Sequence, residues 1–220
     1  MRNIAIIPAR GGSKRLPNKN TMLLGGIPLI AHSILEAKKH SAILDDIYVS
    51  TDDAQIKAIA LSFGANVIDR PAHLSGDSEP TVTALKHVLE SIDFEADSVF
   101  LLQPTNPLRP ENLLVDAFRL FQENQSESLM TVTRNHQKFG KLIDNQFVPF
   151  NYEIGQRSQD LEPLFFENGL LYIIKPALIM QEKIMGNKNF PMIVNHPFAH
   201  VDIDTQEDFD YAAYLLNHKL

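Results

Sequence analysis

The stretch "IIPARGGSKRLPNKN", from Ile6 to Asn20, joins an apolar run to a polar turn near the start of the chain. The apolar run that it completes, residues 4–7, has the length and hydrophobicity of a buried strand. Gly11 and Gly12 follow, and four cationic side chains surround them with no carboxylate between: Arg10, Lys14, Arg15 and Lys19. Such a loop after a first strand is suited to a negatively charged ligand.

The chain as a whole is acidic, in contrast to this loop. Its 220 residues carry a formal net charge of -7, 44% are hydrophobic and 21% are charged, and there is no Cys. This composition predicts one folded domain over residues 1–220, disfavours a nucleic-acid partner and excludes disulfide or thiolate chemistry. The sequence shows no signal peptide and no membrane span, so we expect a cytoplasmic protein with no membrane partner.

Short apolar runs alternate with helical patterns along most of the chain. Strands are expected at residues 3–7, 47–50, 66–68, 98–102, 129–132 and 170–174. Helices are expected at residues 28–40, 56–63, 82–92 and 110–121, and a last helix begins at Thr205, with Asp208 in a capping-box position. This alternation predicts an α/β fold, a three-layer, mostly parallel, doubly wound sheet with helices on both faces. Residues 136–167 break the rhythm and are expected to form a protruding arm.

The loop after the first strand has the chemistry of a phosphate site. Arg10 can clamp phosphate oxygens bidentately, Lys19 can act as a point charge, and Ser13 can donate its hydroxyl. Backbone amides beside Gly11 and Gly12 can line an anion nest. The loop lacks the Gly-Lys-Ser/Thr ending of a Walker A motif and the third glycine of a dinucleotide fingerprint. A solvated basic turn is the alternative that these residues leave open.

A set of ordered motifs connects the chain to a known family. "AIIPARGGSKRLPNKN" resembles the opening motif of the acylneuraminate cytidylyltransferases, the CMP-sialic acid synthetases. The resemblance continues through "PLIAHSI", "VSTDD", "LLQPTNPLR", "ENGLLYI" and "VDIDTQEDF", in this order and over nearly the whole chain. The family's fold is a nucleotidyltransferase α/β sheet, which agrees with the alternation of strands and helices.

The resemblance implies how the chain would hold a nucleotide. Asn20 would lie against the ribose of CTP. Arg70 would contact the base, and the segment that begins at Asp77 would close around the cytosine and ribose. For Arg70, an ordinary loop arginine in solvent is the alternative. The triphosphate would be held by Arg10, Ser13 and Lys19 of the first loop. Gly11 and Gly12, through their backbone amides, belong to the same candidate nucleotide site.

Two further clusters carry polar chemistry. Gln103 follows a central strand and offers both a donor and an acceptor, suited to a sugar hydroxyl or carboxylate; a turn residue that bonds its own backbone is the alternative. Asp202 and Asp204 lie two residues apart, so in an extended segment both carboxylates point to one side. Such a pair suits Mg²⁺ or Mn²⁺ beside substrate phosphates, and the family resemblance implies the same role. Capping of the last helix is the alternative for the pair.

The arm is expected to serve the sugar and the assembly. Arg157 and Tyr172 resemble the family's sugar-binding positions, and the family's arm forms a dimer interface that helps cover the sugar. Paired arginines are common in the family at this point, whereas Ser158 follows Arg157 here, so the position of the carboxylate-binding arginine stays open. Phe165 and Phe166 are candidates either for an apolar wall around an N-acyl group or for the core of a homodimer.

The resemblance implies an enzyme that transfers CMP from CTP to the anomeric hydroxyl of a sialic acid, with release of pyrophosphate. Arg10, Lys19, Asp202 and Asp204 would carry the catalysis. The alternatives are the same chemistry on legionaminic, pseudaminic or another ulosonic acid, and a nucleotide-binding protein without turnover. The "LLQPTNPLR" motif looks nearer to the sialic and legionaminic branches than to the pseudaminic branch.

Overall fold

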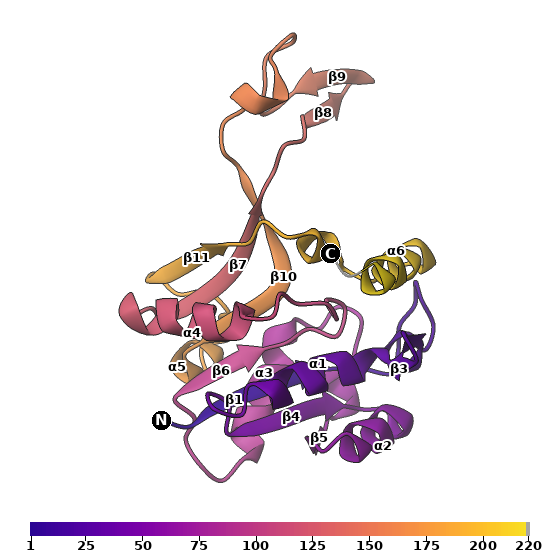
Figure 1. Ribbon diagram of the computed structural model, residues 1–220, viewed down its shortest axis with the longest axis vertical. Helices are drawn as coiled ribbons and strands as arrows, with labels where there is room; N and C mark the ends of the chain where they lie inside the picture. The colour runs from indigo at the N-terminus through magenta and orange to yellow at the C-terminus, as the bar shows by residue number, and fades with distance from the viewer. Residues whose placement is uncertain (219–220) are drawn as a thin grey trace.

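A seven-stranded sheet forms the centre of the computed structural model, which describes residues 1–218 (Figure 1). The strand order is β11-β7-β10-β6-β1-β4-β5. Neighbouring strands run parallel except β10, which lies antiparallel between β6 and β7. The strands are β1 (Asn3–Pro8), β4 (Asp46–Thr51), β5 (Asn66–Asp69), β6 (Ser98–Leu101), β7 (Ser128–Arg134), β10 (Phe165–Ile174) and β11 (Asn189–Ile193).

Helices cover both faces of the sheet, and the expected three layers are confirmed. The alternation along β1 illustrates the pattern: Ala5 and Ile7 pack with one set of helices, Ile4 and Ile6 with the other, and all four are fully buried. The first set is α1 (Leu29–Lys39), α2 (Ala54–Ser62) and α4 (Leu113–Glu123); the second is α3 (Thr81–Ser91) and α5 (Pro176–Ile179).

A smaller apolar cluster brings residues 16–29 together with residues 198–216. It packs α6 (Gln206–Asn217) against a short hairpin of β2 (Leu23–Leu24) and β3 (Ile27–Pro28), with Leu24, Ile203 and Phe209 among its buried side chains. The 3-10 turn η1 (Lys19–Thr21) lies just before this hairpin, and the 3-10 turn η4 (Pro197–His200) lies just before residues 201–205. The cluster therefore places the loop after β1 beside residues 201–205.

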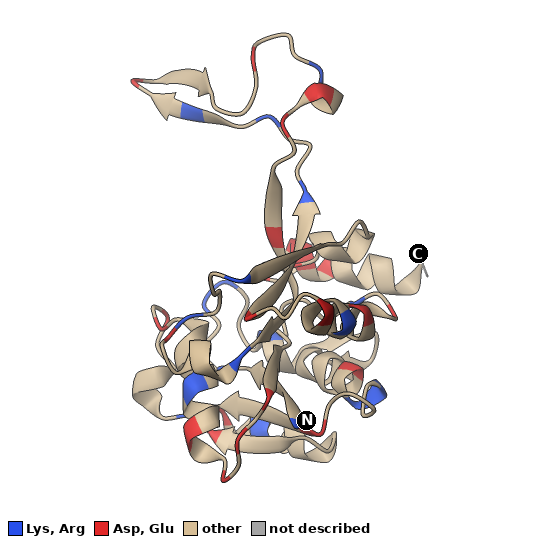
Figure 2. Cartoon of the chain, turned by 90° about the vertical axis from the view of Figure 1, so that its left-hand side faces the viewer, with Lys and Arg blue, Asp and Glu red and all other residues tan. Residues whose placement is uncertain are grey.

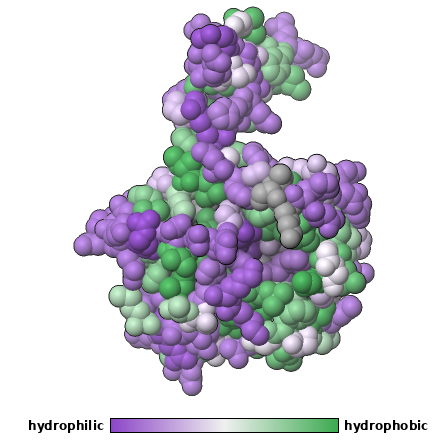
Figure 3. All heavy atoms as spheres, viewed as in Figure 1, coloured by the Kyte–Doolittle hydropathy of each residue, from purple (hydrophilic) through white to green (hydrophobic). Residues whose placement is uncertain are grey.

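The expected arm projects well beyond the sheet at the top of Figure 1. It holds the hairpin of β8 (Gly140–Ile143) and β9 (Gln146–Pro149) and the turn η3 (Ser158–Asp160). The arm ends before residue 167, the end that the sequence predicted, because Phe165, Phe166 and Glu167 already pair with β7 as part of β10. Apolar side chains are exposed along the arm, and Figure 3 shows hydrophobic residues on it and at its junction with the body.

Most of the expected elements occur close to the expected bounds. The helix expected from Pro110 begins at Leu113, whose amide bonds the carbonyl of Pro110 at 3.1 Å. The strand expected at 170–174 is twice as long, because its first half pairs with the end of β7. Strand β11 was not expected, since Pro191 interrupts its apolar pattern; it pairs only with β7, at the edge of the sheet, where proline is tolerated.

Charges of both signs are interspersed over the body and the arm (Figure 2). Among the described residues, no helix combines the length and the apolar character that crossing a bilayer requires. Arg109 is a buried charged residue. Arg109 donates to the carbonyls of Leu170 (2.7 Å) and Gln103 (3.1 Å) and to Ser33 Oγ (3.1 Å), and burial lowers its pKa to about 10, with Glu36 opposing the shift. Arg109 is therefore a structural residue that ties the loop after β6 to β10.

Replacing Arg109 with alanine should lower the free energy of unfolding by about 3 kcal/mol, because two buried carbonyls lose their donor and a cavity opens. Urea denaturation measures this. Arg119→Ala is the matched control: Arg119 lies on the outer side of α4, 57% exposed, in an ion pair with Glu123, and its loss should cost less than about 0.5 kcal/mol. Equal effects of the two substitutions would contradict the structural role of Arg109.

Candidate active site

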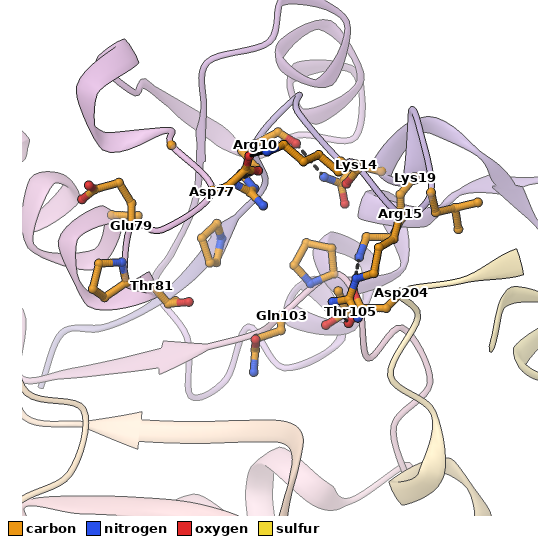
Figure 4. Close-up of a pocket in the computed structure, with 18 of the residues that line it drawn as sticks. Arg10, Lys14, Arg15, Lys19, Asp77, Glu79, Thr81, Gln103, Thr105 and Asp204 are labelled. Atoms are coloured by element: carbon orange, nitrogen blue, oxygen red, sulfur yellow. Dashed lines mark hydrogen bonds and ion pairs between the residues drawn. The ribbon is translucent and has the colours of Figure 1, made fainter.

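A polar cavity of about 540 Å³ opens where β1 and β6 end (Figure 4). The loop after β1 forms one wall, the segment 74–81 another, and Gln103 to Thr105 the floor beside Asp202 and Asp204. Ligands of doubly wound sheets bind at this edge, beyond the carboxyl ends of the parallel strands. Nine of the predicted site residues line the cavity: Arg10, Ser13, Lys19, Asn20, Arg70, Asp77, Gln103, Asp202 and Asp204.

Of the two glycines of the first loop, Gly11 is required by close packing, whereas Gly12 has open space around it. The Gly11 amide donates to Asp52 Oδ1 at 3.0 Å, and a Cβ at Gly11 would lie 2.9 Å from the Cβ of Asp53. Asp53 in turn caps α2 by accepting from the amides of Gln55 and Ile56. Gly11 and Gly12 are not among the residues that line the cavity, so the loop presents side chains rather than the expected glycine amides.

Two carboxylates hold the cations of the first loop in place, one on each side of the cavity (Figure 4). Asp77 pairs with Arg10 at 2.9 Å and with Lys14. These contacts, that of Lys14 first, lower the pKa of Asp77. Asp204 pairs with Arg15 at 2.5 Å and with Lys19 at 2.9 Å.

Lys19 is the most deeply placed of the loop cations. Its side chain is 10% exposed, and its ammonium also donates to the carbonyl of Ile203 at 2.6 Å. Asn20, next to it, is buried and donates to the carbonyl of Arg10 at 3.0 Å, which closes the loop on itself. Lys19 and Asn20 are thus fixed by the fold, whereas Lys14 and Arg15 are exposed at the cavity rim.

Arg70 is a buried member of the cavity wall and not a loop arginine in solvent. Its guanidinium donates to Ser50 Oγ at 3.0 Å and to the carbonyl of Ser50 at 2.6 Å. Burial lowers the pKa of Arg70, and the nearby carboxylate of Asp52 opposes that shift. The side chain therefore comes to the cavity already oriented by the end of β4.

Asp202 and Asp204 face the same cavity, as their spacing predicted. Ile203 between them is fully buried, and its amide donates to the carbonyl of Thr105 at 2.8 Å. Removal of surrounding water raises the pKa of Asp202, a hydrogen bond from Thr105 opposes this, and the charge of Asp204 raises the pKa further. The two carboxylates therefore repel each other at the edge of the cavity.

Capping of α6 is the work of other residues, so the capping alternative for the pair is wrong. Thr205 accepts from the amide of Asp208, and Asp208 Oδ2 accepts from the amide of Thr205 at 2.8 Å, the capping box that the sequence predicted. The same carboxylate accepts from the amide of Asp204 at 3.0 Å. The side chains of Asp202 and Asp204 are left to face the cavity.

A second cavity of about 420 Å³ adjoins the first, since Gln103 and Asp202 line both. Tyr172 lies in it and donates to Glu167 Oε2 at 3.0 Å; burial and then that carboxylate raise the pKa of Tyr172. The antiparallel direction of β10 explains the arrangement, because it brings Glu167 to the same sheet edge as the end of β6. Phe166 also lines this cavity.

The remaining predicted sugar residues lie elsewhere in this chain. Phe165 lines a third, apolar cavity at the base of the arm, with Phe139, Phe150 and Tyr211, and Phe166 borders it as well. Arg157 is on the arm, 71% exposed, and pairs with Asp160 at 2.7 Å. It lines neither of the two polar cavities.

Asn106 is the main residue that sequence reasoning missed. Its side-chain amide donates to the carbonyls of Asn168 (3.0 Å) and Val201 (2.7 Å), so it holds β10 and the Asp202 segment at the two sides of the second cavity. Gly169 leaves room for it: a Cβ there would lie 2.6 Å from Asn106 Oδ1, and its φ of +73° favours glycine. Asn106 belongs to the quoted "LLQPTNPLR" motif, which was the available signal.

Among residues 1–218, no group of three or more His, Asp or Glu side chains is arranged to hold a metal ion. Asp202 and Asp204 therefore contribute two carboxylates, and the other oxygen ligands of a divalent cation would be phosphates and water.

Known proteins are similar to this chain in sequence. A pseudaminic acid cytidylyltransferase of Campylobacter jejuni is 34% identical over 100% of this chain and 99% of its own length. A CMP-N,N'-diacetyllegionaminic acid synthase of Legionella pneumophila is 36% identical over 95% of this chain and 94% of its own. An N-acylneuraminate cytidylyltransferase of Streptococcus agalactiae is 34% identical over 95% of this chain, which spans about half (52%) of that protein.

Solved structures show the same fold at low sequence identity. A CMP:2-keto-3-deoxy-manno-octonic acid synthetase complexed with CTP superposes with a TM-score of 0.74 at 17% identity, over 100% of both chains. A 4-diphosphocytidyl-2C-methyl-D-erythritol synthase from Anaerococcus prevotii gives 0.68 at 16%, over 99% of both. The family model described as cytidylyltransferase matches residues 4–219. The chain therefore belongs to the cytidylyltransferase family.

Proposed function

We propose that the chain transfers CMP from CTP to the anomeric hydroxyl of a nonulosonic acid and releases pyrophosphate. The observation that carries the proposal is the pair of joined cavities: one is lined by the cationic loop, the other by polar side chains, and Gln103 and Asp202 stand at their junction. CTP in the first cavity and a sugar in the second would meet at that junction, with the anomeric hydroxyl of the sugar against the α-phosphate of CTP. Holding two reactants in this way supplies much of the catalysis in nucleotidyl transfer.

The cationic loop would bind the triphosphate and stabilise the charge that develops during transfer. Arg10 and Lys19 are the main groups, with Ser13 and Asn20 beside them, and Arg70 would contact the nucleoside. Their electrostatic effect is strong because Lys19 and Arg70 are buried and already oriented. Asp77 would leave Arg10 and Lys14 when phosphates take its place.

A divalent cation, Mg²⁺ or Mn²⁺, fits the donor set of Asp202 and Asp204. Both are hard oxygen donors, and their mutual repulsion is what a bound cation would relieve. When bound, such an ion supplies positive charge beside the phosphates and lowers the pKa of the attacking hydroxyl. Lys19, at 2.9 Å from Asp204, keeps the carboxylate beside the triphosphate wall.

The acceptor would occupy the second cavity. Gln103, Tyr172 and Glu167 there offer donors and acceptors to a polyhydroxylated sugar. We take sialic acid as the leading acceptor, as the sequence motifs implied. Legionaminic and pseudaminic acids are the alternatives, because the relatives named for the three sugars are all 34–36% identical to this chain. We place the reaction in the cytoplasm, where CTP is made.

A homodimer would complete this site. Arg157 lies on the arm and would reach a sugar carboxylate only on another copy of the chain, and the apolar cavity of Phe165 and Phe166 would lie at that interface. A symmetric interface of this kind pairs the same arm surface on both subunits.

Pyrophosphate release tests the proposed function. The protein is incubated with CTP, Mg²⁺ and each of a panel of sialic, legionaminic and pseudaminic acids, and with ATP, GTP or UTP in place of CTP. Release that needs both CTP and one of the sugars is expected, and chelation of the metal should stop it. Binding of CTP without release for any sugar would favour the alternative of a nucleotide-binding protein without turnover.

Arg10→Ala should lower the rate of pyrophosphate release by roughly 10²-fold, because it removes a charge-assisted contact to the triphosphate. Its thermal midpoint should stay near that of the wild type, since the pairing with Asp77 lies at the surface. Lys57→Ala, which breaks the exposed pair with Asp69 outside the cavity, is the control and should turn over normally. Normal turnover by Arg10→Ala would refute the role of Arg10.

Asp202→Asn and Asp204→Asn should each lose most activity at ordinary Mg²⁺ concentrations and recover part of it at high Mg²⁺ or Mn²⁺. For Asp202→Asn the thermal midpoint at pH 7 should equal or exceed that of the wild type. A folded-state pKa that is raised means that the charged carboxylate costs stability above that pKa. Thr205→Ala is the contrast: it removes the cap of α6 and should cost about 1 kcal/mol of stability. Early melting with normal turnover in both Asp variants would reject the ligand role.

Light scattering at micromolar concentration should find a dimer. Leu142→Asp should convert it to a monomer with low activity, because Leu142 is an 81% exposed apolar side chain on the arm hairpin. Leu61→Asp, at an exposed position of α2 on the body, should leave the dimer intact. A monomeric wild type that is fully active would show that the site is complete in one chain.

A further inference from the structure

Asp204 has both carboxylate oxygens occupied by cations of the first loop. Lys19 donates to Oδ1 at 2.9 Å and Arg15 to Oδ2 at 2.5 Å. The two cations are held very differently. Lys19 is buried and also bonded to the carbonyl of Ile203, whereas the Arg15 side chain is 70% exposed and has no other hydrogen-bond partner among the described residues. Arg15 is thus the partner of Asp204 that can leave.

A divalent cation that approached this carboxylate would meet Arg15 first. The guanidinium occupies Oδ2 and repels a second positive charge. Arg15 also lines the nucleotide cavity, on the same loop as Arg10 and Lys14, so phosphate oxygens offer it another partner. An arginine can bind phosphate oxygens bidentately, whereas the pair of the exposed Arg15 with Asp204 is a single contact of the kind that contributes little.

We propose that Arg15 is a positioning residue that moves from Asp204 to the triphosphate when the nucleotide binds, and thereby opens Asp204 to the divalent cation. The inference rests on the proposed function and extends it to the order of events in the site. Triphosphate and metal then bind with positive coupling, and by linkage each raises the affinity of the other. Before the nucleotide arrives, Arg15 keeps the metal carboxylate occupied.

Lys14 provides the matched control. It lies one residue before Arg15 on the same loop, is 81% exposed, and pairs with Asp77 on the opposite side of the cavity. Lys14→Ala and Arg15→Ala therefore remove the same charge from the same loop, but only Arg15→Ala frees an oxygen of Asp204. A difference between the two variants reports the contact and not the net charge.

The test measures two affinities separately, Mn²⁺ alone by electron paramagnetic resonance and CTP alone by calorimetry in EDTA. Arg15→Ala should bind Mn²⁺ about two- to fivefold tighter than the wild type, the range that the loss of an exposed ion pair allows. The same variant should bind CTP more weakly. Lys14→Ala should also weaken CTP binding but leave the Mn²⁺ affinity unchanged. In Arg15→Ala combined with Asp204→Asn, the gain in Mn²⁺ affinity should disappear.

Opposite changes in the two affinities for Arg15→Ala, together with the lost gain in the double variant, would support the exchange. An unchanged or undetectable Mn²⁺ affinity in Arg15→Ala would overturn it, as would an equal gain in Lys14→Ala. These readouts need no sugar and no turnover. A protein that showed the gain yet released no pyrophosphate would fail the proposed function while keeping the role of Arg15.

Discussion

The ammonium of Lys19 is the contact on which the site depends. It is nearly buried, and a buried charge persists only where carbonyl and carboxylate partners replace the water that it has lost. Those partners, the Ile203 carbonyl and Asp204, come from the far end of the described chain. The contact therefore sets the distance between the cationic wall and the paired carboxylates. Beside it, the hairpin of β2 and β3 and helix α6 form an apolar cluster.

The direction of β10 is the second constraint. A purely parallel sheet would carry the amino-terminal half of this strand to the opposite edge, away from the loop after β1. Because β10 is antiparallel, Glu167 and Tyr172 stand at the edge where β1 and β6 end. The absence of a side chain at Gly169 then gives Asn106 the room to join the strand to Val201. The two polar cavities thus share one edge of the sheet, and a few buried polar contacts determine how far apart they lie.

Local patterns in the sequence were enough for the alternating strands and helices, the basic loop and the capping box at Thr205 and Asp208, since each depends on neighbours in the chain. The spacing of Asp202 and Asp204 also predicted their common side. Partners distant in sequence could not be read in this way. The antiparallel pairing of β10, the edge strand β11, the hub at Asn106 and the pairing of Arg15 with Asp204 all join segments far apart. Gly11 shows the same limit in another way. The sequence predicted that its backbone amide would face a ligand, but a glycine is required there because Asp53, from another loop, approaches it closely.

The separation of 185 residues between Lys19 and Asp204 also has a meaning for biosynthesis. At 5–20 residues per second, a ribosome needs roughly 10–40 s to add the second after the first. Asp77 is made much earlier than Asp204. The nascent loop therefore meets Asp77 first, and this carboxylate can pair with Arg10 and Lys14 while the rest of the sheet is still being translated. The wall of the cavity that carries the basic loop can thus be shaped before its acidic counterpart exists, and arrival of the segment around Ile203 completes the polar cavity.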